Sequence, residues 1–544
     1  MAARRDELNA YTFARKRTVA AFLKPQQNGS AEDAPRPMKA VMPSLIVGAL
    51  ILVGFGGYGM IKPSAPSGWN TPGANVLVGS KSTTRYVYLD SGKKDKAGKE
   101  IDLLHPVLNL ASARLLLSPD KYQVLKVDES VLDNPKILHG PTIGIPYAPD
   151  RLPEKDEAAK PKVWALCEQP IGGSSGSSGS GSSGSGSGGS GDTSNTEKMV
   201  FVLGGEDKKD VEESKNQLKP NEGLFVEAPG GGWYLVDNQG KAYAIGAIPG
   251  TDARGNPVPL TADEKAVRIK LSQALFGASP TPQDVTSDFM GTLKQGAPIA
   301  FPQLDGVGTP SSAAGVPAKH KTIGMVIRVV TGDGPQLYVV LKDRLAPITD
   351  FTSRLLLQGP DATTVYGNAK AEPLTDNLAD IEIGARYDDK KWPAAGPTQV
   401  NTPGGRKVSC SVFNGTADSG GNAVQSTWAG TNYPEEVSEG GTSAYVTPGS
   451  GLLLRRVSSL NNTIGSVFLV TDTGLRYSVP SNGDSDKAAA DTASADPNQA
   501  ADDGPQKRLG YDGVTPVSVP NAWADLLAAG PTLDTTSAKQ PQNQ

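Results

Sequence analysis

One uncharged apolar segment constrains this 544-residue chain more than any other feature. It runs from Ala40 to Ile61, between Lys39 and Lys62, and contains no charged residue. A helix of this length is about 33 Å long at about 1.5 Å per residue, enough to cross a hydrocarbon core of about 30 Å. The sequence therefore predicts one transmembrane helix at residues 40–61, with a short head before it and a large body after it.

The head, residues 1–39, is basic. It carries eight lysine and arginine residues against four acidic ones, whereas the whole chain has a formal net charge of −4. Positive charge beside a membrane span stays on the cytoplasmic side, so we expect the head inside and the body outside. The alternative is a cleaved signal peptide, but the basic region and the apolar segment are too long for one. The sequence Ser64-Ala65-Pro66 also lacks a favourable cleavage site.

The head has helical periodicity between residues 4 and 24. At about 100° per residue, its apolar side chains fall within an arc of about 120°. These side chains are Leu8, Tyr11, Val19, Phe22 and Leu23. We predict a basic amphipathic helix whose apolar face contacts the inner leaflet or a partner helix. The alternative is a positive topology signal with little structure.

Cys167 and Cys410 are the only cysteines in the chain. A large body outside the cytoplasm permits oxidation, so we predict one disulfide. Closing so long a loop would stabilise the fold by roughly 5 kcal/mol at most. The alternative is two unrelated buried thiols. Two cysteines and three scattered histidines (His105, His139 and His320) lack the spacing of a zinc site, and we expect no metal or cofactor.

Four segments of the body have the pattern of a β-hairpin, an apolar strand followed by a polar turn and a second short strand. They are residues 85–107 (with a lysine-rich insertion at 93–99), 232–245, 336–348 and 466–479. Short helical patterns follow at 109–117, 266–276, 350–357 and 523–528. With 43 Pro and 63 Gly to keep the elements short, this predicts an α+β body of small modules. If the cysteines are bonded, the second and third hairpins are inserted between two halves of one central domain.

Three polar segments contain too few apolar residues to fold by themselves. Residues 172–191 are only Gly and Ser, which predicts a flexible coil inserted in one domain. Residues 482–504 are rich in Ala and Asp and predict a disordered loop. Residues 535–544 predict a disordered tail.

A nucleotide enzyme needs a phosphate-binding loop, and residues 73–82 resemble one only superficially. Five residues separate the two glycines, and a serine precedes Lys81. A P-loop requires Gly-x-x-x-x-Gly-Lys-Ser/Thr, because its backbone amides and lysine must converge on the phosphates. Gly-x-Ser-x-Gly combinations in the Gly/Ser segment lack the strand and helix that a nucleophile elbow requires. We therefore expect no catalytic residues.

Several strings of the chain resemble the EccB family, the B component of the actinobacterial type VII (ESX) secretion membrane complex. The resemblance extends from about residue 8 to 536 and keeps the order of the parts. The strings are residues 11–18, 105–115, 140–149, 271–276 and 523–533, together with the two separated cysteines. The Gly/Ser segment, the lysine-rich insertion and the acidic loop depart from the family pattern.

The resemblance implies a single-pass inner-membrane protein with a cytoplasmic N-terminus and a periplasmic body. That body has a β-rich central domain with a disulfide and four hairpin-helix repeat modules. EccB proteins assemble with the EccC ATPase, EccD, EccE and a mycosin protease, with six copies around a pore. Some members are labelled ATPases, a label for which this sequence offers no residues. The expected divisions are the head (1–39), the membrane helix (40–61), module 1 (62–160), the first central half (161–225), module 2 (226–320), module 3 (321–395), the second central half (396–455), module 4 (456–534) and the tail (535–544).

The function expected from these observations is a structural subunit that anchors and assembles the periplasmic part of a secretion complex. One alternative is a module that binds cell-wall polymer through Trp233, Tyr234 and Tyr338, although aromatic residues at such positions are more often core. A second alternative is an extracytoplasmic nucleotide or cell-wall hydrolase. Nucleic acid is not an expected partner, because the chain is acidic and its basic residues are dispersed outside the head.

Overall fold

The computed structural model describes residues 4–23, 38–61, 65–119, 122–171, 196–252, 254, 257–331, 334–376, 383–387, 391–402, 405–437, 443–480 and 504–542. The predicted Gly/Ser insertion at 172–191 lies outside the described residues, as does the predicted loop at 482–504 except for Gly504. The chain divides into two compact units. The smaller contains residues 1–71, 77–84 and 124–138, and the larger contains residues 72–76, 85–123 and 139–544.

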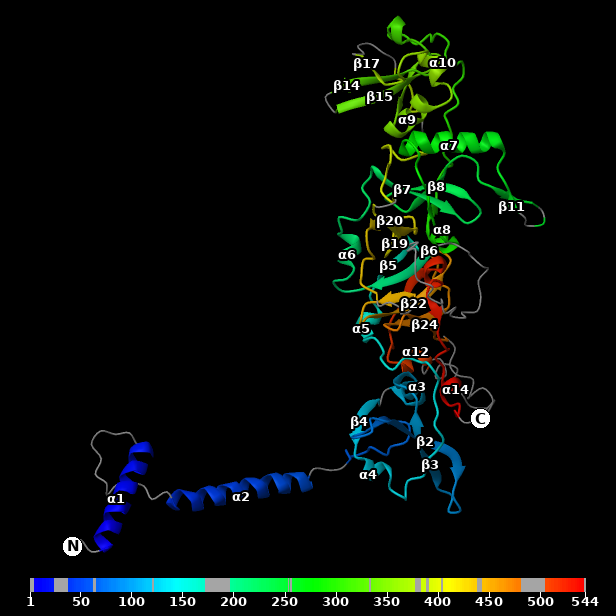
Figure 1. The fold of residues 1–544 in the computed structure, drawn as a ribbon. Helices are drawn as coiled ribbons and strands as arrows, with labels where there is room; N and C mark the ends of the chain where they lie inside the picture. The colour runs from blue at the N-terminus through cyan, green and yellow to red at the C-terminus, as the bar shows by residue number, and fades with distance from the viewer. Residues whose placement is uncertain are drawn as a thin grey trace, which may run out of the picture. The chain divides into compact units, whose positions relative to one another are not determined.

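Two long helices lie in the smaller unit, α1 (Arg4–Leu23) and α2 (Met38–Ile61) (Figure 1). A helix is therefore present at both predicted positions. Among the residues that the structure describes, no helix is both long and apolar enough to cross a membrane. The same unit holds α4 (Glu129–Leu132) and most of the short strands β1 (Asn75–Gly79) and β4 (Gln123–Val127).

The larger unit is built on a five-stranded central sheet with the order β20-β19-β5-β6-β21. Its strands come from two distant parts of the chain, which lie side by side in Figure 1. They are β5 (Val163–Pro170), β6 (Thr196–Leu203), β19 (Val408–Ala417), β20 (Ala423–Gly430) and β21 (Ala444–Val446). Strand β5 pairs antiparallel with both β6 and β19. The polypeptide between β6 and β19 is thus inserted between two halves of one sheet.

Both faces of the central sheet are buried, which explains the unbroken apolar sequence of residues 163–167 in β5. Successive side chains of a strand point to opposite faces. Trp164 and Leu166 accordingly belong to one core cluster, whereas Ala165 and Cys167 belong to another. The first cluster also contains residues of two other sheets, so one face of the central sheet shares its core with its neighbours.

Three further sheets of the larger unit follow one pairing pattern, and each is named here by its first strand. The β7 sheet has β7 (Glu222–Ala228), β8 (Gly232–Val236) and β9 (Lys241–Ala244) as an antiparallel meander. The short strand β12 (Gln283–Asp284) pairs parallel with β7, and β13 (Lys294–Gln295) pairs parallel with β9. Strand β18 (Thr398–Gln399) also pairs with β7.

The β22 sheet repeats this arrangement, with β25 parallel to β22 and β26 parallel to β24. Its strands are β22 (Gly451–Val457), β23 (Val467–Thr471), β24 (Leu475–Ser478), β25 (Val517–Pro520) and β26 (Ala528–Ala529). In the β14 sheet, β17 pairs parallel with β14, and Leu345 of β16 forms a parallel bridge with Ile383. Its strands are β14 (Val326–Thr331), β15 (Gly334–Val340), β16 (Leu345–Ile348) and β17 (Leu374–Thr375).

All four predicted hairpins are confirmed by strand pairing. The first consists of β2 (Arg85–Lys94) and β3 (Glu100–Val107), and the others are β8–β9, β15–β16 and β23–β24. The sequence reading missed the strand that precedes each of the last three hairpins. Because β7 and β22 start before residues 226 and 456, two of the predicted divisions cut through a sheet.

Short helices connect these strands. The helices near the predicted positions are α3 (Leu110–Leu116), α7 (Ala262–Phe276), α9 (Asp350–Gln358) and α13 (Asn521–Ala524). The other described helices of this unit include α5 (Lys155–Ala158), α6 (Lys209–Glu212), α8 (Ser287–Thr292), α10 (Ala362–Tyr366), α12 (Pro505–Arg508) and α14 (Thr535–Ala538).

Helix α7 joins two sheets through its apolar side. It starts with a capping box between Thr261 and Glu264, which satisfies free amides of its first turn. Leu271 and Leu275 lie in a core cluster with Phe225 of the β7 sheet, and the same cluster contains Phe351 of α9. The β7 sheet is therefore packed against the helix that follows the β14 sheet.

The prediction of a disordered tail at 535–544 is wrong for its described part. Residues Thr535–Ala538 form α14, and Thr535 and Ala538 are buried. Asp534 caps the helix by accepting a hydrogen bond from Ser537 N. Gln542 Nε2 donates to Gly144 O at 2.6 Å. A helix cap and side-chain to backbone hydrogen bonds hold the tail, and no continuous apolar side does so. The polar composition of the tail therefore did not predict these contacts.

Candidate structural site at the disulfide

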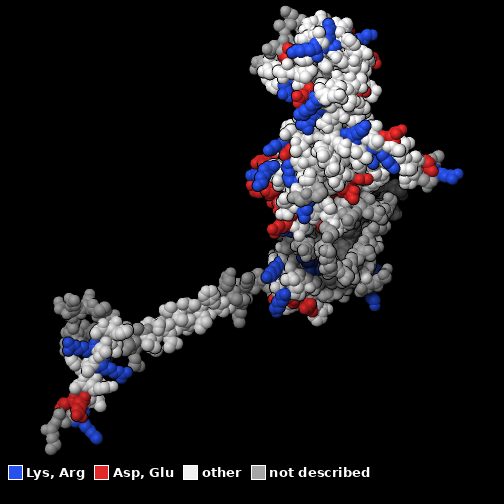
Figure 2. Space-filling model, turned by 45° about the horizontal axis from the view of Figure 1, so that its top comes forward, with Lys and Arg blue, Asp and Glu red and all other residues white. Residues whose placement is uncertain are grey.

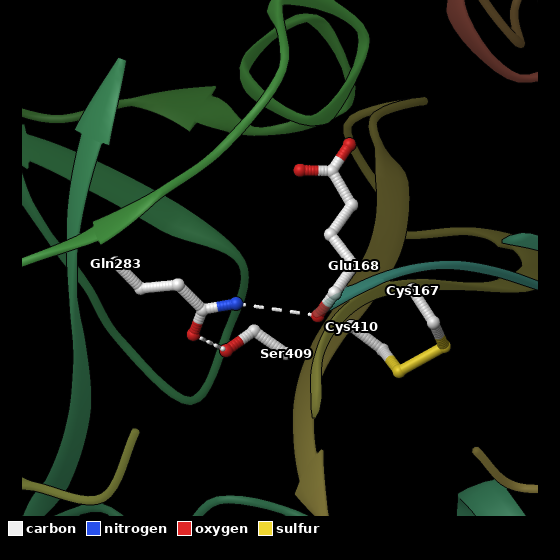
Figure 3. The surroundings of a disulfide bond; sticks show 5 residues. All are labelled: Cys167, Glu168, Gln283, Ser409 and Cys410. Atoms are coloured by element: carbon white, nitrogen blue, oxygen red, sulfur yellow. Dashed lines mark hydrogen bonds between the residues drawn. A yellow bond between two sulfur atoms is a disulfide. The ribbon is translucent and has the colours of Figure 1, made fainter. Parts of the chain in front are cut away.

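The two predicted cysteines are bonded to each other. Cys167 of β5 and Cys410 of β19 stand directly opposite in the antiparallel register, with Cα atoms 4.0 Å apart and an S–S bond of 2.04 Å. Both residues are fully buried. The bond joins the two halves of the central sheet at their boundary, so the predicted disulfide is confirmed (Figure 3).

The residues beside the cysteines bond to the β7 sheet. Figure 3 shows Ser409 and Gln283 on one side of the paired strands and the disulfide on the other. Ser409 Oγ donates to Gln283 Oε1 at 2.8 Å, and Gln283 Nε2 donates to the carbonyl of Glu168 at 3.2 Å. Because Gln283 lies in β12, these bonds connect both disulfide-bearing strands to the edge of the β7 sheet.

Glu168 is the most unusual group of this region. It is fully buried, and its carboxyl group accepts hydrogen bonds from both the backbone amide (2.9 Å) and the hydroxyl of Thr286. Burial raises the pKa of Glu168 to about 7, although the bonds from Thr286 and the charge of Lys198 act to lower it. Lys198 itself pairs with Asp288 at 2.5 Å. Removal from water therefore outweighs hydrogen bonding at this carboxyl group.

Asn401, which lies between β18 and β19 at the end of the inserted polypeptide, bonds to strands β7 and β12. Its amide accepts a hydrogen bond from Phe225 N at 3.0 Å and donates to Phe225 O at 2.9 Å. It also donates to Gln283 Oε1 at 3.2 Å. Asn401 is 4% exposed, so it replaces water for both backbone groups of a core strand. We call the side chains of Glu168, Gln283, Thr286, Asn401 and Ser409 the polar junction.

An ion pair between buried Lys162 and half-buried Glu157 joins the central sheet to the β22 sheet. Lys162 Nζ lies 2.5 Å from Glu157 Oε1, and the lysine side chain is 2% exposed. Ser450 Oγ, directly before β22, donates to the same carboxylate at 3.0 Å. The bond from Lys162 is the largest cause that lowers the pKa of Glu157 to about 2. Together with the polar junction, this pair ties the central sheet to both of its neighbours.

The sequence reading missed the polar junction and the Glu157–Lys162 pair. One usable signal is the position of Glu168 directly after the apolar segment that contains Cys167. A carboxylate at the next position of a buried strand needs partners. Its partner Thr286 is 118 residues away, a contact that no local pattern reveals.

The predicted apolar face of the head lies on α1 and is exposed. Leu8 is 67% exposed, Tyr11 70% and Phe22 90%, and Val19 is exposed as well. The side chain of Leu23 lies outside the described part of the helix. Phe13 is a further exposed aromatic residue, 54% accessible, which lies about 140° around the helix from Leu8. The role of this face as a contact surface stays a prediction.

The segment that superficially resembles a P-loop holds a carboxylate of the chain itself. Glu129 Oε1 accepts hydrogen bonds from Lys81 N and Ser82 N, each at 2.7 Å, and Oε2 accepts one from Ser80 Oγ at 2.9 Å. These bonds, chiefly the one from Ser82 N, lower the pKa of Glu129 to about 2. A side chain at Gly79 would overlap the carboxylate. The amides that could face a phosphate are thus occupied.

The histidines and aromatic residues considered in the sequence analysis contact other parts of the chain. His105 Nδ1 lies 2.9 Å from Pro141 O, and His320 Nδ1 lies 2.7 Å from Asp376 Oδ2. Among the described residues, no group of three or more His, Cys, Asp or Glu is placed to hold a metal ion. Trp233 is covered by the guanidinium of Arg268 at 4.2 Å, and Tyr338 is only 8% exposed. The aromatic residues considered for polymer binding therefore take part in packing.

Basic and acidic side chains are interspersed over the face of the body seen in Figure 2. The buried polar groups described above connect sheets to each other, and the disulfide connects the halves of the central sheet. Fold and site together define a multi-sheet structural protein centred on one disulfide.

Comparison with known proteins identifies its family. The family described as "Type VII secretion system ESX-1, transport TM domain B" matches residues 1–544. The chain therefore belongs to the EccB family of type VII secretion systems, as its sequence resemblance predicts.

The relatives include the "ESX-3 secretion system ATPase EccB3" of Mycolicibacterium smegmatis (strain ATCC 700084 / mc(2)155), which is 26% identical over 519 residues, covering 91% of this chain and 83% of the relative. The "ESX-1 secretion system ATPase EccB1" of M. smegmatis (strain MKD8) is 24% identical over 92% of this chain and 87% of the relative.

Two solved structures have a similar fold. A chain of an intact ESX-5 inner membrane complex matches with a TM-score of 0.53 and 20% identity, over 100% of this chain and 96% of that chain. An EccB3 dimer from the ESX-3 core complex matches with a TM-score of 0.52 and 22% identity, over 86% of this chain and 99% of that chain. These similarities concern the fold.

Proposed function

We propose that this chain is a structural subunit of a type VII secretion inner-membrane complex, in which it anchors and assembles the periplasmic part around the export pore. The observation that carries the proposal is the central sheet. A disulfide joins its two halves, and the polar junction and the Glu157–Lys162 pair hold it to the neighbouring sheets. A subunit that transmits position between a membrane and a large assembly needs such rigid connections.

The topology that we propose is a single membrane crossing by α2, with the head in the cytoplasm and the body in the periplasm. The uncharged segment 40–61 and the basic head support it. The described large apolar side chains of α2 are exposed, as a lipid-facing helix requires. They are Val41, Met42, Leu45, Ile46, Val47, Leu50, Ile51, Leu52, Val53 and Phe55.

We also propose that the body consists of the central domain and four copies of one repeat module. The β7, β14 and β22 sheets support this, because each starts with a three-stranded meander whose first strand has a parallel partner. The β2–β3 hairpin supports a fourth copy. It is followed by α3, and its second strand has parallel bridges at Leu104–His139 and Val107–Ile143.

The partners proposed for this chain are further secretion subunits and other copies of itself. The similar chains come from ESX-5 inner membrane complexes and from an EccB3 dimer, and the family resemblance implies EccC, EccD, EccE and a mycosin protease, with six copies per complex. We assign the cytoplasmic contact to the apolar face of α1 predicted from Leu8, Tyr11, Val19, Phe22 and Leu23, of which the first four are exposed.

We propose that the chain itself does not hydrolyse ATP, although its relatives carry ATPase in their names. The amides of the segment that resembles a P-loop bind Glu129, and the spacing of its glycines does not fit a phosphate. In this proposal, ATP hydrolysis belongs to a partner subunit.

Gentle detergent extraction through a C-terminal affinity tag tests the proposal. Native electrophoresis and mass spectrometry of the product should show a megadalton assembly that contains an ATPase and multi-pass membrane proteins. A lone monomer or dimer, found in several mild detergents at native expression, would contradict it. ATPase activity of the purified chain, abolished by replacing Lys81, would contradict the non-enzymatic assignment.

A further inference from the structure

The hairpin of β2 and β3 ends in an exposed basic tip. Its base is anchored, since Val87 and Leu104 are fully buried. Residues 92–100 are all exposed. The strands continue as a ribbon beyond the packed part of the hairpin (Figure 1). On the side of β3, residues 99–101 carry the ribbon about 10 Å beyond the Asp90–Asp102 pair.

Residues 93–100 carry four lysines, Lys93, Lys94, Lys96 and Lys99, which form what we call the lysine tip. The same segment contains two acidic residues, Asp95 and Glu100, so its net charge is +2. Asp90 and Asp102, which stand opposite each other, lie farther from the turn. Asp95 shapes the turn, because its Oδ1 accepts hydrogen bonds from Ala97 N (2.8 Å) and Lys99 N (2.9 Å). None of the four lysines has an ion-pair partner among the described residues.

A short segment of the chain connects α2 to this hairpin. Gly73 N donates to Tyr88 O of β2 at 2.7 Å, so only the residues from Ile61 to Gly73 separate the end of α2 from the hairpin. Twelve residues span at most about 40 Å when fully extended. If α2 crosses the membrane, the lysine tip is therefore tethered within reach of the outer lipid surface.

We propose that the lysine tip binds anionic lipid headgroups on the outer surface of the membrane that α2 crosses. The proposal rests on the single-pass topology given above. Lysine ammonium groups on a two-stranded ribbon place several positive charges at one headgroup layer. The carboxylate of Asp95 bonds to backbone amides of the turn and not to a lysine ammonium group of the tip. Near an anionic surface each net positive charge adds roughly a fivefold preference, so a net charge of +2 favours contact about thirtyfold.

The test uses the full chain in lipid nanodiscs of phosphatidylcholine alone or mixed with phosphatidylglycerol. Both native cysteines are in the disulfide, so the single new thiol of Ala97→Cys accepts a fluorescent donor selectively. Energy transfer to an acceptor on lipid headgroups reports the distance of the tip from the surface. A separate variant, Ser67→Cys, places the donor six residues after α2, as a measure of membrane insertion.

We expect transfer from position 97 to be higher in anionic than in neutral nanodiscs. The difference should vanish when salt is raised from about 0.15 M to about 1 M, because the screening length falls from about 8 Å to about 3 Å. Replacing all four tip lysines by glutamate should abolish it, and replacement by glutamine should reduce it. The same reversal at four exposed lysines of the central domain (Lys208, Lys209, Lys215 and Lys219) should leave it unchanged.

Equal transfer from position 97 in both lipid compositions would overturn the inference, provided that position 67 shows high transfer in both. A difference that survives the reversal of the tip lysines would overturn it as well. Low transfer from position 67 would instead contradict the single-pass topology. The two proposals therefore fail in distinguishable ways.

Discussion

The buried carboxyl group of Glu168 gives the sharpest quantitative prediction. Its pKa is raised by burial from the ordinary 4.5 to about 7. At a pH between these values the unfolded chain releases the proton and the folded protein keeps it, so stability falls as pH rises through this window and is constant above it. The difference corresponds to about 3 kcal/mol. In the variant Glu168→Gln this loss is absent.

Glutamine keeps the hydrogen-bonding pattern of the protonated acid, because its amide accepts from Thr286 N and donates to the Thr286 hydroxyl. We therefore expect variant and wild type to be similarly stable near pH 4.5. The variant should become more stable by up to about 3 kcal/mol above pH 7. The charged or titratable groups around Glu168 are Lys198, Asp288 and Tyr433, and all three stay in place.

The assay is urea unfolding of the detergent-solubilised full chain at a series of pH values, followed by tryptophan fluorescence, since Trp164 lies in the core on the same strand as Glu168. Glu264→Gln is a control of opposite sign. Bonds from Thr261 lower the pKa of Glu264, so that variant should lose stability relative to wild type as pH rises. A difference between Glu168→Gln and wild type that does not change with pH would refute the reasoning.

Three further substitutions test the connections of the central sheet by the same unfolding assay. Replacing both cysteines by alanine should lower stability by roughly 5 kcal/mol at most, and an unchanged urea midpoint would contradict the role of the bond. Glu157→Ala leaves Lys162 buried without its carboxylate and should cost about 3 kcal/mol, whereas Glu157→Ala with Lys162→Met should recover most of the loss. Asn401→Ala leaves both backbone groups of Phe225 without partners and should cost about 2 kcal/mol. A cost below about 0.5 kcal/mol would show that water replaces the amide.

The elements that the sequence reading predicted correctly are those with strong local patterns. The hairpins combine an apolar strand, a polar turn and a second short strand. The helices at 350–357 and 266–276 follow directly from their apolar spacing. The cysteine pair needed no local pattern, because only one intramolecular pairing exists. The division into two central halves followed from that pairing.

The missed elements depend on contacts between distant residues. Strands β12, β17 and β26 have two residues each, too short for any periodicity, and they exist only because a neighbouring strand offers hydrogen bonds. The polar junction likewise brings Glu168 to Thr286 and Phe225 to Asn401 across more than a hundred residues. The tail at 535–542 was missed for the same reason, since its partners lie in residues 115 and 144.

The exposed face of α1 allows the most direct test of the assembly claim. Leu8→Glu with Phe22→Glu places two negative charges on the proposed contact face, and Phe13→Glu places one negative charge on the other side of the helix. The measurement is the mass of the detergent-extracted complex by native electrophoresis. The account predicts that the double variant loses the megadalton assembly and that Phe13→Glu retains it. Full assembly with the double variant would contradict the account.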